Sequence, residues 1–422
     1  MKIIQDNIFF ILLTFLPISI IIGSAVSIVN IVLLGVIYLY FFFKCDHFKH
    51  LLKNNTIKIF LILYLYLVLN TFISLNFETS VLRNFGFIRF IILFLAINYL
   101  FYIEKKNLRI FYFWTIIFLI FVFDVNFERF TGANIFGWGA ISIEGVEQPH
   151  GPRVVSFFKD EPIAGAFLNG FIFLILGQVL EIIKKKKFRN IIFFVIILIF
   201  IFSILITGER SNAIKAAFGL LFFIYLIDIF DLKSKIVFLI ILPIIITITV
   251  INSNYLKNRY HGQILSKIFT EKRFQNLENN IYIKLYKSGF TVFKNYPLVG
   301  VGNKNYRIET CGEKEKAKKN DYYCITHPHQ IYFEFLSEHG LIGTFLLLSV
   351  FFTLIFQHLK VIILSQNYLQ IGAFCFLLCN FLPIIPSGAF FSDFNITLFV
   401  INLSIMYAVN RKTNVFFSKK ES

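Results

Sequence analysis

The segment 326–340 (THPHQIYFEFLSEHG) holds the residue types in this chain that are best suited to chemistry. His327 and His329 flank Pro328, between a hydrophilic stretch and an apolar run. Proline is favoured at the first position of a helix, and the free N–H groups of a first turn disfavour a protonated imidazole. We therefore predict that His329 is neutral near pH 7 and able to accept a proton. The alternative is that both histidines are only cap and turn residues.

Two arginines adjoin apolar runs, where a charged side chain is costly and usually faces the protein interior. Arg210 lies in a short turn (TGERSN, 207–212), and Arg153 lies in a segment that leads into another run (PRVVSFFKDEP, 152–162). The planar guanidinium group matches phosphate through paired hydrogen bonds. We predict that both arginines bind an anionic group. The alternatives are pairing of Arg210 with Glu209 or anchoring at lipid headgroups, and an ordinary surface position for Arg153.

The composition predicts a membrane protein. Of 422 residues, 57% are hydrophobic and 18% are aromatic, which ordinary soluble domains do not show. Several runs are almost uncharged and long enough to cross ~30 Å of hydrocarbon as helices. We predict an all-α, polytopic protein with about 12 transmembrane helices and a large helical periplasmic loop. The expected spans are 7–23, 26–43, 59–76, 86–103, 110–124, 162–181, 191–207, 211–229, 236–251, 339–357, 368–386 and 394–410.

The net charge of +17 follows the expected topology. If the N-terminus is cytoplasmic, 20 of the 41 Lys and Arg residues fall in short cytoplasmic segments, as the positive-inside rule requires. Much of the excess charge therefore reports orientation, and nucleic-acid binding is not expected. We predict a bacterial inner-membrane protein with both termini in the cytoplasm.

The expected spans divide the chain into three parts. Residues 1–251 form a transmembrane bundle with a periplasmic loop near 125–161, and residues 252–338 form the large periplasmic loop that carries the histidine motif. Residues 339–422 supply the last spans and a cytoplasmic tail. Within the large loop, 279–296 has the apolar spacing of an amphipathic helix. No internal repeat is convincing, so the sequence does not support an inverted-repeat transporter.

Cys311 and Cys324 both fall in the large loop, which faces an oxidising compartment in this topology. We predict that they form a disulfide, which in the chain-entropy model restrains the unfolded loop by ~3 kcal/mol. The alternative is a pair of free thiols. A bridge here ends three residues before His327 and so restrains the chain that enters the histidine motif.

His329-Gln330, followed by Gly340 and Gly343, resembles the signature of the bacterial O-antigen polymerase and ligase superfamily. In that family, a histidine followed by Asn, Ser or Gln precedes a spaced glycine pair. The segments around Arg153 and Arg210 resemble two further family patterns, and cysteines before the histidines recur in some members. The similarity covers about residues 150–345.

The outer segments contain no Asp-x-Asp, HExxH or GxSxG pattern and no complete phosphate-binding glycine loop.

The resemblance implies a glycosyltransferase at the periplasmic face of the inner membrane. It takes an oligosaccharide from undecaprenyl diphosphate and passes it to a glycan acceptor, with inversion and without a metal or other cofactor. In this interpretation His329 is the base, and Arg210 and Arg153 hold the diphosphate. The expected substrate-binding residues are His327, Arg307, Glu338 and Tyr332. The expected partners are the donor, the acceptor and the bilayer, and a chain-length regulator is a further candidate partner.

Three activities share this donor: O-antigen, capsule or exopolysaccharide polymerase, O-antigen ligase, and protein O-oligosaccharyltransferase. We favour the polymerase because it is the commonest activity for such chains, and no residue decides between them. A membrane transporter is a rival of a different class, since twelve spans suit it equally. Against it, the ionisable residues concentrate in outer loops instead of at the membrane midplane. A glycan-binding or scaffold role is the remaining alternative.

Overall fold

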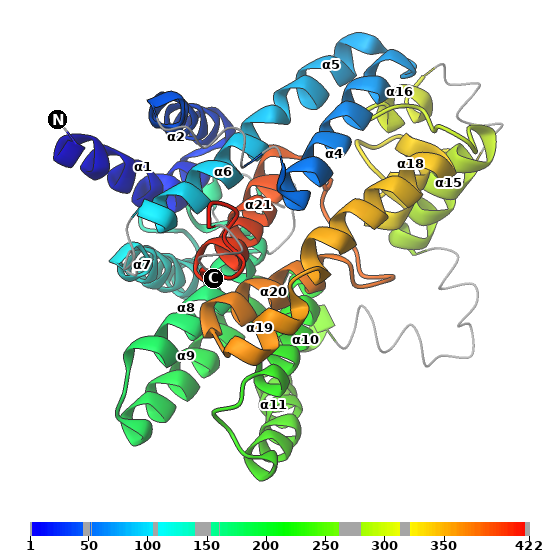
Figure 1. Cartoon of the computed structure of the whole chain (residues 1–422). Coiled ribbons are helices and arrows are strands. Elements are labelled where there is room, and N and C mark those ends of the chain that lie inside the picture. The colour runs from blue at the N-terminus through cyan, green and yellow to red at the C-terminus, as the bar shows by residue number, and fades with distance from the viewer. Residues whose placement is uncertain are drawn as a thin grey trace.

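The computed structural model describes residues 2–44, 51, 53–103, 109–139, 153–159, 161–260, 280–312 and 321–417. Every regular element in these ranges is helical (Figure 1). The helices are α1 (Lys2–Ile22), α2 (Ser24–Lys44), α4 (Asn55–Phe72), α5 (Phe77–Gly86), α6 (Ile88–Ile103), α7 (Arg109–Thr131), α8 (Ala164–Ile182), α9 (Lys186–Ile206), α10 (Arg210–Leu226), α11 (Leu232–Ile251), α12 (Asn254–Leu256), α15 (Ile281–Asn295), α16 (Tyr306–Thr310), α18 (Ile331–Phe356), α19 (Leu359–Ser365), α20 (Tyr368–Asn380) and α21 (Asp393–Ala408), with a 3₁₀ turn at Ser156–Phe158.

The described residues include eight helical stretches that are long and apolar enough to cross a membrane, which confirms the predicted class of polytopic helical membrane protein. Three shorter apolar helices, Asn7–Ile22, Tyr368–Asn380 and Asp393–Ala408, match three more of the expected spans. The remaining expected span, 211–229, corresponds to α10, a 17-residue helix that begins at Arg210.

The centre of the bundle is α8, which is buried along almost its whole length and packs against α7, α9, α10 and α20 (Figure 1). The contact with α20 is unusually close. A Cβ atom added to Gly372 of α20 would lie 2.2 Å from the carbonyl oxygen of Phe173 in α8, so only glycine permits this approach. By contrast, α11 exposes most of its apolar side chains at the edge of the bundle, as a lipid-facing helix does.

The expected span 110–124 is too short. Helix α7 continues to Thr131, so the buried carboxylate of Glu128 lies inside the helix together with that of Asp124. Asp124 accepts a hydrogen bond from the backbone N–H of Ile135 at 3.0 Å, and Glu128 accepts one from Val155 N at 3.1 Å. Because these two acids satisfy backbone donors of the following segment, the helix extends past the apolar run and binds the chain that carries Arg153.

The expected span 368–386 is too long at its C-terminal end. Helix α20 ends at Asn380, before Pro383 and Pro386. Proline removes a backbone donor and disfavours helical geometry in the preceding residue, so two prolines three residues apart exclude a helix here. Residues 381–392 instead form an irregular segment that leads into α21.

Helix α18 joins the histidine motif to a membrane span, with a break at Gly340 (φ 61°). The break frees the N–H groups of Leu341 and Ile342, which donate to the carbonyls of Pro297 and Leu298 at 2.8 and 3.1 Å. In return, the carbonyls of Ser337 and Glu338 accept from Val301 and Gly302 at 3.0 and 2.8 Å. The loop 297–302 is therefore inserted into α18 by backbone pairing.

The large loop is helical where it is described. The amphipathic helix expected at 279–296 is confirmed as α15, although Asn279 lies outside the described residues. A small core of Val292, Val301, Tyr306 and Tyr322 fixes this region on α18. The structure joins the two cysteines that the sequence pairs, Cys311 and Cys324, in a disulfide. In the first outer segment, His150 and Asp160 lie outside the described residues.

Candidate functional site

A cavity of about 1130 Å³ opens between the bundle and the large loop. Its walls come from widely separated regions of the chain: α5, the segment before α8 with the first half of α8, the turn between α9 and α10, Arg259, the segments 280–286, 304–307 and 326–329, and residues 376–398. A cavity of this size is large for a single small molecule. Its walls combine apolar side chains with a set of charged and amide groups.

The structure brings five of the seven predicted site residues to this cavity. They are Arg153, Arg210, Arg307, His327 and His329. Tyr332 and Glu338 do not line it. The hydroxyl of Tyr332 donates to the carbonyl of Phe381 at 2.7 Å, and Glu338, 2% exposed, accepts from the backbone N–H of Tyr306 at 3.3 Å. Both side chains are occupied in holding neighbouring loops, so the expectation that they touch substrate is not supported.

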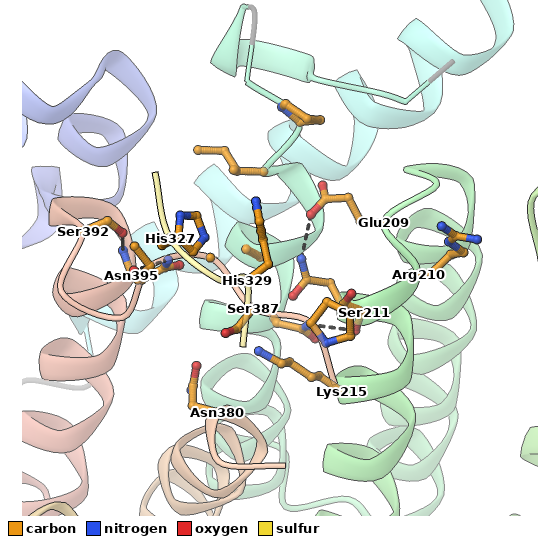
Figure 2. A pocket seen from close by; sticks show the side chains of 18 of the residues that line it. Glu209, Arg210, Ser211, Lys215, His327, His329, Asn380, Ser387, Ser392 and Asn395 are labelled. Atoms are coloured by element: carbon orange, nitrogen blue, oxygen red, sulfur yellow. Dashed lines mark hydrogen bonds between the residues drawn. The ribbon is translucent and has the colours of Figure 1, made fainter. Parts of the chain in front are cut away.

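The two histidines lie side by side at the centre of the pocket, with Ser387 and Lys215 below them in the view of Figure 2. Their ring centroids are 4.0 Å apart. The Nδ1 atom of His327 pairs with the hydroxyl of Thr326 at 2.9 Å. Within the described part of the chain, the Nε2 of His327 and the hydroxyl of Ser387 have no hydrogen-bond partner. Both residues line the cavity, so these two buried polar atoms lie beside it with unused hydrogen-bonding capacity.

His329 precedes the helix, which corrects the prediction that it sits in the first turn. Gln330 is the N-cap of α18, and its side-chain oxygen accepts from the N–H groups of Tyr332 and Phe333 at 2.8 and 3.0 Å. Pro328 is therefore not the first helical residue. His329 adopts a left-handed backbone conformation (φ 55°), and its carbonyl accepts from Ser387 N at 2.9 Å. The helix begins later because glutamine supplies the capping acceptor.

Burial keeps both imidazoles neutral. It lowers the pKa of His327 to about 3, with further contributions from His329 and from the positive charge of Arg83. It also lowers the pKa of His329, and the charge of Arg153 acts in the same direction. The predicted protonation state thus has a different cause from the one inferred from the sequence, because desolvation replaces the helix N-terminus as the main effect.

Three arginines gather on one wall: Arg153, Arg210 and Arg259. Burial lowers the pKa of Arg153, and the charge of Arg259 lowers it further. The backbone fixes their positions, because Val154 N donates to the carbonyl of Thr207 at 3.1 Å and Arg259 Nε donates to that of Gly208 at 3.0 Å. Like charges held this close favour an anion between them.

Glu209 does not pair with Arg210. Its carboxylate accepts from Gly165 N and from the side chain of Asn212, each at 2.6 Å, so it fastens the turn to the start of α8. In Figure 2, Arg210 lies at the start of α10, on the side of Glu209 away from the histidines. This geometry removes one of the alternatives considered for Arg210.

Sequence reasoning missed several residues that line the cavity. Arg83 belongs to α5, which lies in the connection between the expected spans 59–76 and 86–103, and it is part of no recognised motif. Lys304 follows the glycines of an apparent turn and carried no recognised motif. Lys215 falls in the expected span 211–229, and residues 384–386 fall in the expected span 368–386. The two prolines at 383 and 386 were the one signal that marked the last of these as a loop.

The cavity is strongly cationic. Its described lining contains seven Lys and Arg residues against two acids, Glu161 and Glu209. Among the described residues, no group of three His, Cys, Asp or Glu side chains is placed to hold a metal ion. The arrangement is suited to binding a polyanion next to neutral imidazoles that accept a proton.

Comparison with known proteins agrees with this chemistry. Residues 193–348 match the family model described as O-antigen ligase. The matched segment contains Arg210, Arg259, Arg307 and both histidines of the pocket, whereas Arg153 and Arg83 lie outside it. No curated protein matches the chain. The match supports an activity of the O-antigen ligase or polymerase type. Residues 193–348 of this multi-pass membrane protein thus match an O-antigen ligase family domain, which supports its resemblance to the O-antigen polymerase and ligase superfamily.

Proposed function

We propose that the chain polymerises undecaprenyl-diphosphate-linked oligosaccharide repeat units at the periplasmic face of the bacterial inner membrane, with both termini in the cytoplasm. The observation that carries the proposal is the cavity in which Arg153 and Arg210 line the same space as His329. The guanidinium groups are suited to a diphosphate, and the neutral imidazole is suited to a hydroxyl proton. The family match on residues 193–348 supports the same class of reaction.

In the proposed reaction, an acceptor hydroxyl attacks the anomeric carbon of the donor sugar. The new C–O bond forms as the bond between that carbon and the diphosphate oxygen breaks, and the electron pair leaves with the diphosphate. His329 takes the hydroxyl proton, while Arg153 and Arg210 stabilise the charge that grows on the leaving group. Because diphosphate leaves readily, the step needs neither a general acid nor a metal. Direct attack inverts the anomeric centre.

A ligase is the second candidate, because the matching family model is described as O-antigen ligase. It uses the same donor and differs only in the acceptor, as does a protein O-oligosaccharyltransferase. Glycans from a deletion strain separate the candidates. Single repeat units in place of long chains indicate a polymerase, whereas long chains that remain unattached to their final acceptor indicate one of the two transferases.

The donor role of the arginines is tested with Arg153→Gln and Arg210→Gln. Each change removes one charged donor to the leaving group, so we expect the rate of glycosyl transfer to fall by ~10²–10³ at normal membrane abundance. Arg109→Gln is a matched control, since Arg109 is exposed at the start of α7 and does not line the cavity. Wild-type rates in both cavity variants would remove the arginines from the mechanism.

A further inference from the structure

The cavity has a second group of basic residues besides Arg153, Arg210 and Arg259. Arg83 lines it from α5, Lys304 from the turn that leads into α16, and Arg307 from α16 itself. Helices α5 and α16 lie together at the top of Figure 1, whereas α10, which begins with Arg210, lies near its centre. The two groups therefore reach the same cavity from different elements.

The turn that presents Lys304 is held by buried polar groups. Asn303 and Asn305, both 0% exposed, flank the lysine and attach it to α4 and α5. The side chain of Asn303 donates to Asn84 Oδ1 at 2.6 Å, and Asn305 Oδ1 accepts from the N–H of Asn76 at 2.8 Å. Buried amides with this many partners fix a single backbone geometry.

Lys304 itself has a left-handed backbone conformation, with φ 67°. This region is unfavourable for a lysine and is retained only where the surroundings impose it. A glycine would satisfy the turn at lower cost. The turn alone therefore gives no reason for a lysine at this position, whereas the cavity that the side chain lines gives one.

The acid that interacts with Lys304 is itself paired with an arginine outside this basic group. Burial lowers the pKa of Lys304, the charges of Arg83 and Arg307 lower it further, and Asp393 opposes them. Asp393 forms an ion pair with Arg89. Lys304 and Arg307 thus repel one another without a dedicated counter-ion among the described residues, and a bound anion would relieve that repulsion.

Arg83 interacts electrostatically with Glu334 and Glu338, two acids buried in α18. This interaction offsets part of its positive charge. These two acids also accept backbone hydrogen bonds, from Phe390 at 2.9 Å and from Tyr306 at 3.3 Å. Lys304 and Arg307 therefore have less negative charge beside them than Arg83 has.

The two histidines connect the two basic groups. The charge of Arg153 acts on His329, and the charge of Arg83 acts on His327, although burial is the larger influence on both rings. The histidine pair, whose ring centroids are 4.0 Å apart, therefore lines the same cavity as both basic groups. A reaction centre at His329 would then have one anion site for each of two reactants.

We propose that Lys304 and Arg307, supported by Arg83, form a second anion-binding subsite that holds a phosphate or carboxylate group of the acceptor while Arg153 and Arg210 hold the donor diphosphate. The inference rests on the proposed function, because it assigns the second group of cations to the second substrate. The inference implies that the acceptor is an anionic glycan, which carries either its own phosphate or an acidic sugar.

Titration of inorganic diphosphate into the purified full chain in phosphatidylcholine nanodiscs tests the subsite. We expect two sites per wild-type chain. Arg153→Gln with Arg210→Gln should weaken one of them at least ~10-fold, and Lys304→Gly with Arg307→Gln should weaken the other by a similar factor. Lys284→Gln with Lys287→Gln is a charge-matched control, since both lysines are exposed on α15 and do not line the cavity. A single site in the wild type, or loss of both sites with either pair, would overturn the proposal.

Variants of Lys304 separate binding from folding. Lys304→Gly suits φ 67°, so it should leave thermal stability equal to or above that of the wild type while it weakens the second site. Lys304→Arg keeps the charge and should retain two sites. A stable glycine variant with both sites intact would show that the lysine binds nothing.

Titration with glucuronic acid distinguishes the two sources of negative charge. Tighter binding of glucuronate than of diphosphate at the Lys304 site assigns it to an acidic sugar, and the reverse assigns it to a phosphate. Binding does not depend on turnover. A chain that transfers glycan but binds one diphosphate contradicts the subsite alone, whereas a chain that binds two diphosphates but transfers no glycan contradicts the proposed function alone.

Discussion

The backbone holds His329 in place from both sides of the residue. Its carbonyl accepts from Ser387 of the segment before α21, and its C-terminal neighbour Gln330 caps α18. The capping contact explains the residue type after the histidine in the pattern that this chain resembles. Asn, Ser and Gln all carry a side-chain oxygen that can accept from the first N–H groups of a helix. The motif therefore couples the imidazole to the helix start.

From the lowered pKa values of the two histidines we predict how activity depends on pH. An unperturbed histidine gains a proton near pH 6.5, but burial lowers the pKa of His329 below this value and that of His327 to about 3. We expect kcat/KM to persist as the pH falls through 6.5 and to be lost only at lower pH. A pH–rate profile of the purified protein checks this, and an acidic limb centred at or above pH 6.5 would contradict it.

The same two histidines also determine how the stability of the fold depends on pH. Below about pH 6.5 the unfolded chain binds protons at both positions while the folded chain does not, so protonation favours the unfolded state. Their contribution therefore destabilises the fold progressively as the pH drops below 6.5, and for His327 the loss continues towards pH 3. Thermal denaturation of His327→Gln should show a weaker loss of stability over this window than the wild type.

At the scale of elements, the break in α18 positions the pocket loops. Gly340→Ala places a Cβ 2.4 Å from the carbonyl carbon of Leu298 at a residue with φ 61°. We expect this change to destabilise the protein by ~2 kcal/mol or more and to reduce activity, because the displaced 297–302 loop leads directly to Lys304 and Arg307. Thermal unfolding and a transfer assay on the same preparation measure both effects.

Gly312→Ala is the matched control for this prediction. A Cβ at Gly312 would have the carbonyl oxygen of Ile308 as its nearest neighbour, at 3.4 Å, and the residue needs no left-handed backbone. Its unfolding temperature should match the wild type. Equal stability of Gly340→Ala and Gly312→Ala would show that the break in α18 does not depend on glycine.

The disulfide closes a short loop ahead of the histidines. Cys311 and Cys324 are separated by 13 positions, so replacing both by serine should lower the stability of this region by ~3 kcal/mol. Activity at low temperature should survive, since Gln330 and Ser387 hold the motif independently of the bridge. Reductant should lower the unfolding temperature of the wild type and not that of the double variant. An equal response of the two proteins would exclude the bridge as the cause.

At the scale of the whole molecule, local patterns predicted the elements better than their ends. Apolar runs located the spans, and the apolar spacing of α15 located the helix in the large loop. Hydropathy did not predict the helix ends that buried acids or prolines determine. Buried Asp124 and Glu128 extend α7 beyond its apolar run, and Pro383 and Pro386 end α20 within one.

The candidate site was predictable where residues form a motif and not where the tertiary structure assembles them. His329, Arg210 and Arg153 lie in recognisable segments, and all three line the cavity. Arg83 and Lys304 belong to no pattern, and only the packing of the 302–307 turn on α4 and α5 brings them to the same space. The cause of the low pKa of His329 is likewise burial by distant segments, which a local sequence cannot show.

The most direct test of the proposed chemistry is glycosyl transfer by the purified chain in nanodiscs from an undecaprenyl-diphosphate-linked oligosaccharide. His329→Asn suits this test because asparagine tolerates the left-handed backbone but supplies no base. His358→Asn, whose imidazole packs against Tyr407 away from the cavity, is the control. We expect the rate of His329→Asn to fall by at least ~10² and that of His358→Asn to remain near the wild type. A wild-type rate for His329→Asn would contradict the assignment of this histidine as the proton acceptor.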